Sequence, residues 1–316
     1  MKTRKLLSYP ALLALILLLS GCASSLVFWN QATEKFDQAA ELEMRSRISA
    51  RLSTAGDTPP PGALPGVDNL FSATTTTTSE NPEQLYRMAD EKITKALAAP
   101  APLKKESKLA NAYTLKALTS WKTGQAEEAR VNAAKALQEF ENQAEPSPRD
   151  KPLAKAIPGL VALDLAADTI KAMTERLKAQ AEGAQGMPAA EAGEVIAKAR
   201  ALYDEFVADA ANDHSVAGAQ KDLDEALELT GENKDLQLYL ILSRMTGLKN
   251  RFDLWAQIDN FAKRSGRKAA DAALRNWISS EEQSYLSDKD AALVQLKALA
   301  DGGEQSAVYR YWDGVL

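Results

Sequence analysis

Cysteine and histidine supply much of the catalytic and metal-binding chemistry of proteins, and this chain has one of each, Cys22 and His214. A reactive thiolate needs a nearby base or cation, and the sequence around Cys22 provides neither. His214 lies in the stretch ANDHSVAG, beside Asp209 and Asp213. This stretch predicts a helix cap rather than a catalytic base. No nucleophile triad, phosphate-binding glycine loop or metal-ligand spacing occurs, so we expect a protein that is not an enzyme and has no cofactor or metal.

The residues before Cys22 have the pattern of a secretory leader. A positive stretch, MKTRK, precedes an almost entirely apolar run over residues 6–19, which is too short to span ~30 Å of hydrocarbon comfortably. Three roles are open for Cys22 at this point: part of a membrane anchor, a reactive thiol, or an attachment point. The run ends in LSGC at residues 19–22, which resembles the bacterial lipobox.

The lipobox resemblance implies that residues 1–21 are a cleaved signal peptide and that the mature chain begins at an acylated Cys22. Several acyl chains, palmitate among them, would give durable membrane anchoring, whereas one chain holds only marginally. Residue 23 is Ala and not the Asp that resembles an inner-membrane retention signal. We therefore expect a lipoprotein of the cell envelope, on the periplasmic face of the outer membrane.

Composition favours helices and argues against nucleic acid. The 316 residues are 45% hydrophobic and only 6% aromatic, alanine and leucine are abundant, and β-branched residues are sparse outside one threonine tract. The net charge of −5, with mixed signs and no basic stripe, does not suit phosphate neutralisation. An all-α protein without a nucleic-acid partner is expected.

Three parts follow Cys22 along the mature chain. Residues 22–52 carry apolar positions at helical spacing, which predicts a first amphipathic helix that either packs on the body or lies on the membrane surface. Residues 53–82 contain five prolines and five consecutive threonines, which predicts a flexible loop, either disordered or a binding element. Residues 83–316 read as one domain of consecutive helices.

The apolar periodicity of this domain predicts its individual helices. Asn81 is expected to cap the first, with Pro82 at its first position and an apolar face that ends at Leu97. Further helices are expected at 103–123, 126–141, 160–182, 188–211, 216–230, 234–246, 252–265, 268–286, 288–300 and 306–312. Three prolines between residues 146 and 152 are expected to interrupt the chain before the helix at 160–182.

The stretch YTLKALTSWKTGQAEEARVNAAKAL resembles a tetratricopeptide repeat, a helical hairpin that stacks on its neighbours. The matching positions are the aromatic Tyr113, the small Ala117, Trp121 beside an aromatic position, the turn at Gly124, the signature Ala129 and the closing pair Ala136-Leu137. Residues 89–97 resemble the second helix of a preceding repeat, 40 residues earlier. The resemblance implies helix-turn-helix repeats that form a tetratricopeptide-like α-solenoid.

A weaker match covers the stretch LDEALELTGENKDLQLYLILSRMTGLKNRFDLW. In this stretch Ala226-Leu227 would close one repeat, and Gly231 replaces the proline that usually follows. Gly247 would form the next turn, although it is slightly out of register with the repeat pattern. Trp255 occupies the position at which the family has alanine. An irregular helical bundle with chance periodicity is the alternative to a solenoid here.

Aromatic residues supply the candidate binding surface. Tyr113, Trp121, Trp255 and Trp277 are candidates to line a binding groove, although aromatics at helical spacing also form cores. The acidic pairs Glu127-Glu128 and Glu281-Glu282 are expected to lie on solvated helix faces. The terminal stretch AVYRYWDGVL is expected to close the solenoid or to serve as a docking segment.

These observations favour a membrane-anchored scaffold or assembly factor that binds an envelope protein or peptide on the concave face of its repeats. This is what the likeness to tetratricopeptide-type lipoproteins implies. The alternative is a small-ligand-binding lipoprotein of a solute uptake system, which predicts a deep, tryptophan-lined pocket. The two differ in whether the aromatic residues face an open groove or an enclosed cavity.

Overall fold

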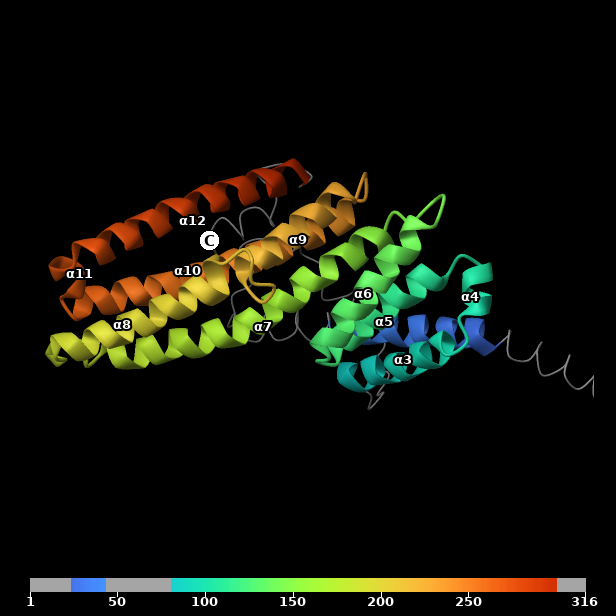
Figure 1. The fold of residues 1–316 in the computed structure, drawn as a ribbon, viewed down its shortest axis with the longest axis horizontal. Coiled ribbons are helices and arrows are strands. Elements are labelled where there is room, and N and C mark those ends of the chain that lie inside the picture. Colours follow the sequence, from blue (N-terminus) through green and yellow to red (C-terminus); the bar gives the residue numbers. More distant parts are fainter. Residues whose placement is uncertain (1–23, 44–80, 300–316) are drawn as a thin grey trace, which may run out of the picture. The chain divides into compact units, whose positions relative to one another are not determined.

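The computed structural model describes residues 24–43 and 81–299, and all regular structure in these two ranges is helical (Figure 1). The expectation of an all-α protein is confirmed. The chain divides into two compact units, Met1–Ser147 and Pro148–Leu316. The division falls among the prolines at 146–152, within residues 83–316, which were predicted to form one repeat domain. The leader, Cys22, most of the threonine/proline segment and the terminal stretch lie outside the described residues.

Unit 1 contains the helix of residues 24–43 and four further helices, whose bounds are α3 Pro82–Leu97, α4 Ala101–Lys105, α5 Leu109–Lys122 and α6 Ala126–Glu141. Asn81 caps α3 as predicted, because its Oδ1 accepts the Gln84 N–H at 2.8 Å and Pro82 follows it. The α5–α6 turn contains Gly124 at φ +77°, as the repeat resemblance implies. The predicted helix at 103–123 is in fact two helices, separated at Ser107, which adopts φ +53°.

The helix of residues 24–43 packs against the rest of unit 1. Its Ala32 is fully buried with Ile93 and Ala96 of α3 and with Leu103, Leu109, Ala112 and Leu115 of α4 and α5. Ala39 is buried with Leu85 and Tyr86. The first helix was expected either to pack on the body or to lie on the membrane surface. Residues 24–43 pack on the body.

Unit 2 is built around one long central helix (Figure 1). Its helices are α7 Asp150–Ala181, α8 Ala189–Tyr203, α9 Val216–Glu228, α10 Lys234–Arg264, α11 Arg267–Ala270 and α12 Ala272–Leu299, with a 3₁₀ turn at Ala184–Gly186 and a π-helical turn at Asp204–Ala208. α10 contacts α7, α8, α9, α11 and α12. The fully buried side chains Leu240, Met245 and Phe261 belong to α10. The core of this unit therefore follows the length of α10.

Two breaks predicted in unit 2 do not occur. The ranges 234–246 and 252–265 form one helix of 31 residues, and α12 continues through residue 287 for 28 residues. Gly247 is a packing residue and not a turn, since a Cβ there would lie 2.9 Å from Leu163 Cδ2 and 3.2 Å from Val216 Cγ1. A glycine at a helix crossing lets neighbouring helices approach closely.

The start of α7 also differs from the expectation. α7 begins at Asp150 rather than at residue 160 and runs for 32 residues. Pro152 lies in its first turn, where a missing N–H leaves no hydrogen bond unmade. Pro158 lies inside the helix and removes one backbone hydrogen bond, but the surrounding residues Ala154, Ala156, Ile157 and Leu160 are buried. Tertiary packing therefore outweighs the helix-breaking tendency of proline here.

Candidate functional site

The four aromatic residues proposed for a groove belong to different units. Tyr113 and Trp121 lie on α5 in unit 1, whereas Trp255 and Trp277 lie on α10 and α12 in unit 2. All four are half-buried. The Tyr113 ring packs against the core of unit 1, and Lys122 Nζ lies 4.5 Å from the centre of the Trp121 ring.

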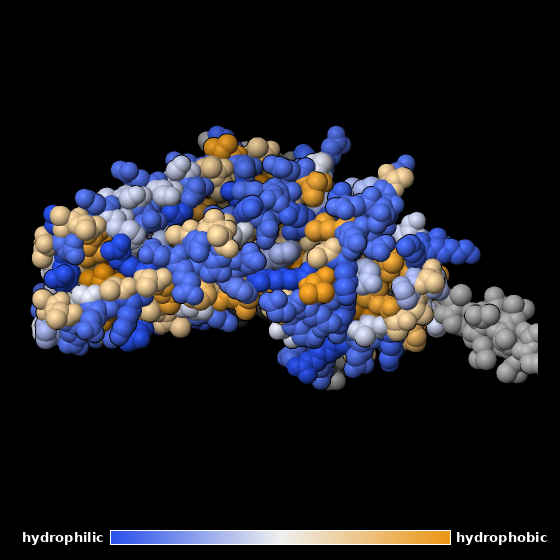
Figure 2. Space-filling model, viewed as in Figure 1, coloured by the Kyte–Doolittle hydropathy of each residue, from blue (hydrophilic) through white to orange (hydrophobic). Residues whose placement is uncertain are grey.

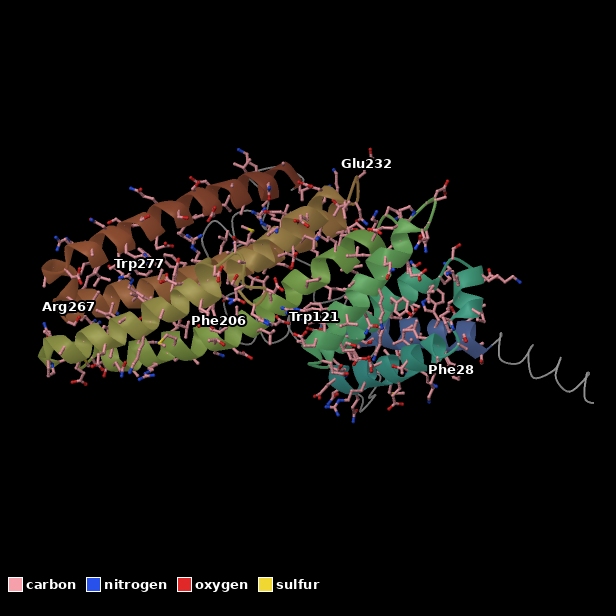
Figure 3. All side chains as sticks on the ribbon, in the orientation of Figure 1. Phe28, Trp121, Phe206, Glu232, Arg267 and Trp277 are labelled. Atoms are coloured by element: carbon pink, nitrogen blue, oxygen red, sulfur yellow. The ribbon has the colours of Figure 1, made fainter. Side chains whose placement is uncertain are left out.

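The two tryptophans of unit 2 connect helices. The Trp255 indole N–H donates to the carbonyl oxygen of Ile278 on α12 at 3.1 Å. The Trp277 ring meets the Tyr203 ring edge-on at 5.3 Å, and the Arg200 guanidinium lies 4.7 Å from the centre of the Trp277 ring. Figure 3 shows Trp277 among the helices of unit 2. Both side chains make contacts that hold α8, α10 and α12 together.

Tyr203 is the hub of a polar cluster that links the same three helices. Its hydroxyl donates to Glu281 Oε2 at 2.7 Å and accepts from Arg251 Nε at 2.9 Å. The two terminal nitrogens of Arg251 pair with Glu281 at 3.2 Å and with Asp288 at 2.6 Å. The Arg251 and Glu281 side chains are 12% and 20% exposed, so this pair is largely shielded from water, whereas Asp288 is 44% exposed.

Electrostatics keep the Tyr203 hydroxyl of this cluster protonated. Burial raises the pKa of the Tyr203 hydroxyl far above its ordinary value, and the hydrogen bond to Glu281 raises it further, although the Arg251 charge opposes both. The tyrosine stays protonated and remains a hydrogen-bond donor. The arrangement is suited to tying α8, α10 and α12 together rather than to proton transfer at neutral pH.

Unit 1 contains a comparable cluster around Lys116. The ammonium group donates to both oxygens of Asp90 at 2.9 Å and pairs with Glu128 at 3.0 Å. The Thr119 hydroxyl donates to Asp90 Oδ1 at 2.7 Å. The Lys116 side chain is 8% exposed, so one buried cation connects α3, α5 and α6.

These two clusters revise the prediction for the acidic pairs. Glu127 is 79% exposed as expected, but its neighbour Glu128 pairs with buried Lys116, and Glu281 pairs with Arg251. Sequence reasoning missed both clusters. One available signal was the position of Lys116, four residues after Ala112 and four before Ser120, within a run of α5 residues that are mostly apolar or small. A charge in such a run needs a buried partner of opposite sign.

The region around His214 forms a helix cap, as predicted. The Ser215 hydroxyl accepts the Gly218 N–H at 2.9 Å at the start of α9 and donates to the Asp209 carbonyl oxygen at 2.6 Å. The His214 backbone N–H donates to Asn212 Oδ1 at 2.9 Å. Within the described ranges, no group of three or more metal-ligating residues occurs, and no helix is long and apolar enough to cross a membrane.

The helix of residues 24–43 is fastened to unit 1 at both ends. Near its start, the Ser25 hydroxyl donates to the Ala99 carbonyl oxygen at 3.0 Å, and Lys108 Nζ lies 5.2 Å from the centre of the Trp29 ring. At its other end, Glu43 accepts from the Tyr86 hydroxyl at 2.7 Å and pairs with Lys122 at 3.0 Å. Ordered structure therefore starts no more than two residues after Cys22.

Two hollows of the described surface do not contain the candidate aromatics. One of about 460 Å³ lies against α7 and α8 and is lined by Asp168, Thr169, Ala172, Met173, Arg176 and Leu202. The other, of about 390 Å³, lies in unit 1 beside Lys104, Glu139 and Asn142. The first is wide open, and neither is the enclosed, tryptophan-lined pocket that small-ligand binding predicts.

No protein-family model, curated protein or solved structure matches this chain.

Proposed function

We propose that this chain is a lipid-anchored helical scaffold of the cell envelope that binds a protein or peptide partner. The observation that carries the proposal is the hairpin formed by α5, Gly124 and α6, with its turn and its small residues at the positions that the tetratricopeptide resemblance implies. Ala117, Ala129, Ala133 and Ala136 are all fully buried. Small residues at these positions allow α5 and α6 to pack closely, as stacked helical hairpins require.

The helix of residues 24–43 and α3 supply a second helix pair in unit 1. α5 packs on both members of this pair, because Leu109, Ala112 and Leu115 share a core with Ala32, Ile93 and Ala96. A following helix that packs on both members of the preceding pair is the arrangement of stacked helical repeats. This packing supports a tetratricopeptide-like reading of unit 1, with the long segment 44–80 inserted within its first pair.

The second part of the proposal is that a lipid on Cys22 anchors the chain to the membrane. Cleavage before Cys22 and acylation of its thiol would place the lipid directly beside the helix of residues 24–43. Anchoring at the periplasmic face of the outer membrane would raise the effective concentration of the scaffold for envelope partners. Tyr113 and Trp121 are our candidates for partner contact in unit 1, since each residue is only partly buried.

Photocrosslinking in living cells tests this function. A benzophenone amino acid at position 113 or 121 is expected to capture the same envelope protein repeatedly, whereas the matched probe at Arg87, an exposed residue of α3, captures less of it. Cys22→Ala is expected to release the chain from the membrane fraction and to lower the yield of the crosslink. Repeated crosslinking without any envelope protein would overturn the scaffold proposal.

A further inference from the structure

One end of unit 1 combines exposed apolar residues with a group of lysines. We define the anchor-proximal surface as Val27, Ala99, Ala101, Lys104, Lys105 and Lys108, all of which are exposed. The Ser25–Ala99 hydrogen bond and the Lys108–Trp29 contact hold the start of the helix of residues 24–43 beside these residues. Figure 3 shows Phe28 at the same end of unit 1, and Figure 2 shows hydrophobic and hydrophilic residues side by side there.

The position of Cys22 places this surface near the bilayer. Only Ala23 separates Cys22 from Ser24, and two residues span at most ~7 Å in any conformation. Acyl chains on Cys22 would enter the hydrocarbon near Val27, a residue that is 47% exposed. This step rests on the acylation put forward under the proposed function.

The charge of the anchor-proximal surface is opposite to that of the chain. Residues 104–108 contain three exposed lysines and one glutamate, whereas the whole chain carries a net charge of −5. Lysines within a Debye length of ~8 Å from an anionic membrane are attracted to it, and the attraction is screened by salt. A basic group beside exposed apolar residues is the composition of a membrane-interface contact.

We propose that the anchor-proximal surface docks unit 1 on a bilayer containing anionic phospholipids, so that the lipid anchor and the lysines together fix the orientation of this unit. An anchor alone would hold unit 1 at the membrane without fixing its orientation. With the surface docked, α4 lies against the headgroups, while the α5–α6 turn at Gly124, at the other end of α5, points away from them.

Depth-dependent fluorescence quenching on the full mature chain tests this orientation. An acylated Cys22 thiol does not react with maleimide, so Ala101→Cys or Gln125→Cys introduces a single reactive thiol for a fluorophore. The lipidated chain is placed in vesicles of phosphatidylcholine and phosphatidylglycerol that contain a nitroxide-labelled lipid. Quenching at position 101 is expected to be at least about twofold stronger than at position 125, because an interfacial element lies within ~5–10 Å of the acyl boundary.

Charge reversal separates docking from simple tethering. Lys104→Glu with Lys105→Glu is expected to remove the difference between positions 101 and 125, as is high salt, whereas the control pair Lys171→Glu with Lys178→Glu on α7 leaves it unchanged. Equal quenching at both positions in a chain that still floats with vesicles would overturn the docking proposal and leave the anchor intact. A chain without an acyl mass on Cys22 would instead contradict the proposed function.

A second copy of the chain is the rival occupant of this surface. In that case, signals at position 101 would depend on the protein-to-lipid ratio. We expect the same quenching after tenfold dilution of the protein within the vesicles, and quenching that changes on dilution would assign the surface to self-association and contradict membrane docking.

Discussion

A turn glycine of unit 1 and a crossing glycine of unit 2 are constrained in different ways, although Gly231 and Gly266 of unit 2 also adopt positive φ. In unit 1, Gly124 adopts φ +77°, and a Cβ added to it would meet no atom within 4 Å, so the constraint is on the backbone alone. In unit 2, Gly159 lies inside α7, and its added Cβ would lie 2.8 Å from the Ala219 carbonyl oxygen of α9. The constraint there comes from a neighbouring helix.

These two positions show why a glycine within a helical pattern does not by itself mark a turn. Short helices of 14 and 16 residues meet at Gly124, as a helical hairpin requires. Helices of 31 and 32 residues in unit 2 cross at Gly159 and Gly247 without turning there. A glycine between apolar helical segments therefore indicates either a turn or a close crossing, and sequence spacing does not separate the two.

The largest effect is expected from Lys116→Met in unit 1. The substitution leaves Asp90 and Glu128 beside a largely buried site without their cation, and breaking a buried pair in this way destabilises by about 3 kcal/mol or more. Urea unfolding followed by hydrogen exchange of α3 and α5 measures the loss. Arg87→Met is the control, because its ion pair with Glu83 is exposed and contributes little. Equal losses in the two variants would show that the buried cation has no special role.

Gly159→Ala tests the close crossing in unit 2. The added methyl group must push α9 away, so we expect a loss of about 2 kcal/mol in the free energy of unfolding. Faster hydrogen exchange in α7 and α9, with unit 1 unchanged, is the accompanying signature.

Gly193→Ala provides the matched control, since its added Cβ would approach only the Arg267 guanidinium, at 4.0 Å. In a helix interior this change is expected to stabilise by about 0.5–1 kcal/mol. If both substitutions stabilise the protein, α9 does not approach Gly159 as closely as the structure shows.

Gly124→Ala tests the turn in unit 1 and is expected to cost about 1 kcal/mol, because a side chain is disfavoured at positive φ even in open space. Gly124→Asn should lose less, since asparagine tolerates this conformation better. Thermal unfolding of the two variants gives the comparison. An alanine variant as stable as the parent would mean that the turn can adopt another conformation.

The smallest effect on stability at neutral pH is expected from substitution of Tyr285 in unit 2. Its effect becomes visible only at alkaline pH. Burial, and then the charge of Asp253, raise the pKa of Tyr285 from 10.0 to about 12. Between these values the unfolded chain releases the phenolic proton while the folded chain retains it, so stability falls as pH rises from 10 to 12. Tyr285→Phe should reduce this loss of stability, and phenolate absorbance of the folded parent should show a tyrosine that ionises late. An unchanged pH profile in the variant would contradict the raised pKa.

Sequence reasoning found the helices through local signals. Asn81 and Ser215 mark helix starts because their side chains cap the first turn, and Gly124 marks a helix end because it adopts positive φ; all three act as expected. Such preferences need no knowledge of what lies nearby. The helical class and most helix starts could therefore be predicted.

The helix lengths and the arrangement of side chains in the site depend on contacts between residues that are distant in sequence. Gly247 of α10 packs closely against Leu163 and Val216, which are distant in sequence, and the partner of Glu281 is Arg251, 30 residues away. The prediction of a groove grouped aromatic residues by their type alone, although Tyr113 and Trp255 belong to different units. Helical spacing identifies buried faces but not which faces meet, and for the same reason the partners of the buried charges could not be predicted.

The fastening of residues 24–43 also has a consequence for chain entropy. Because Glu43 is hydrogen-bonded to Tyr86, the two points that flank residues 44–80 are held together by unit 1 itself. Closing a flexible connection becomes harder only slowly with its length, by about 0.6 kcal/mol for each doubling. A connection of the flexible kind that the sequence predicts for residues 53–82 could therefore change in length at little cost to the stability of unit 1.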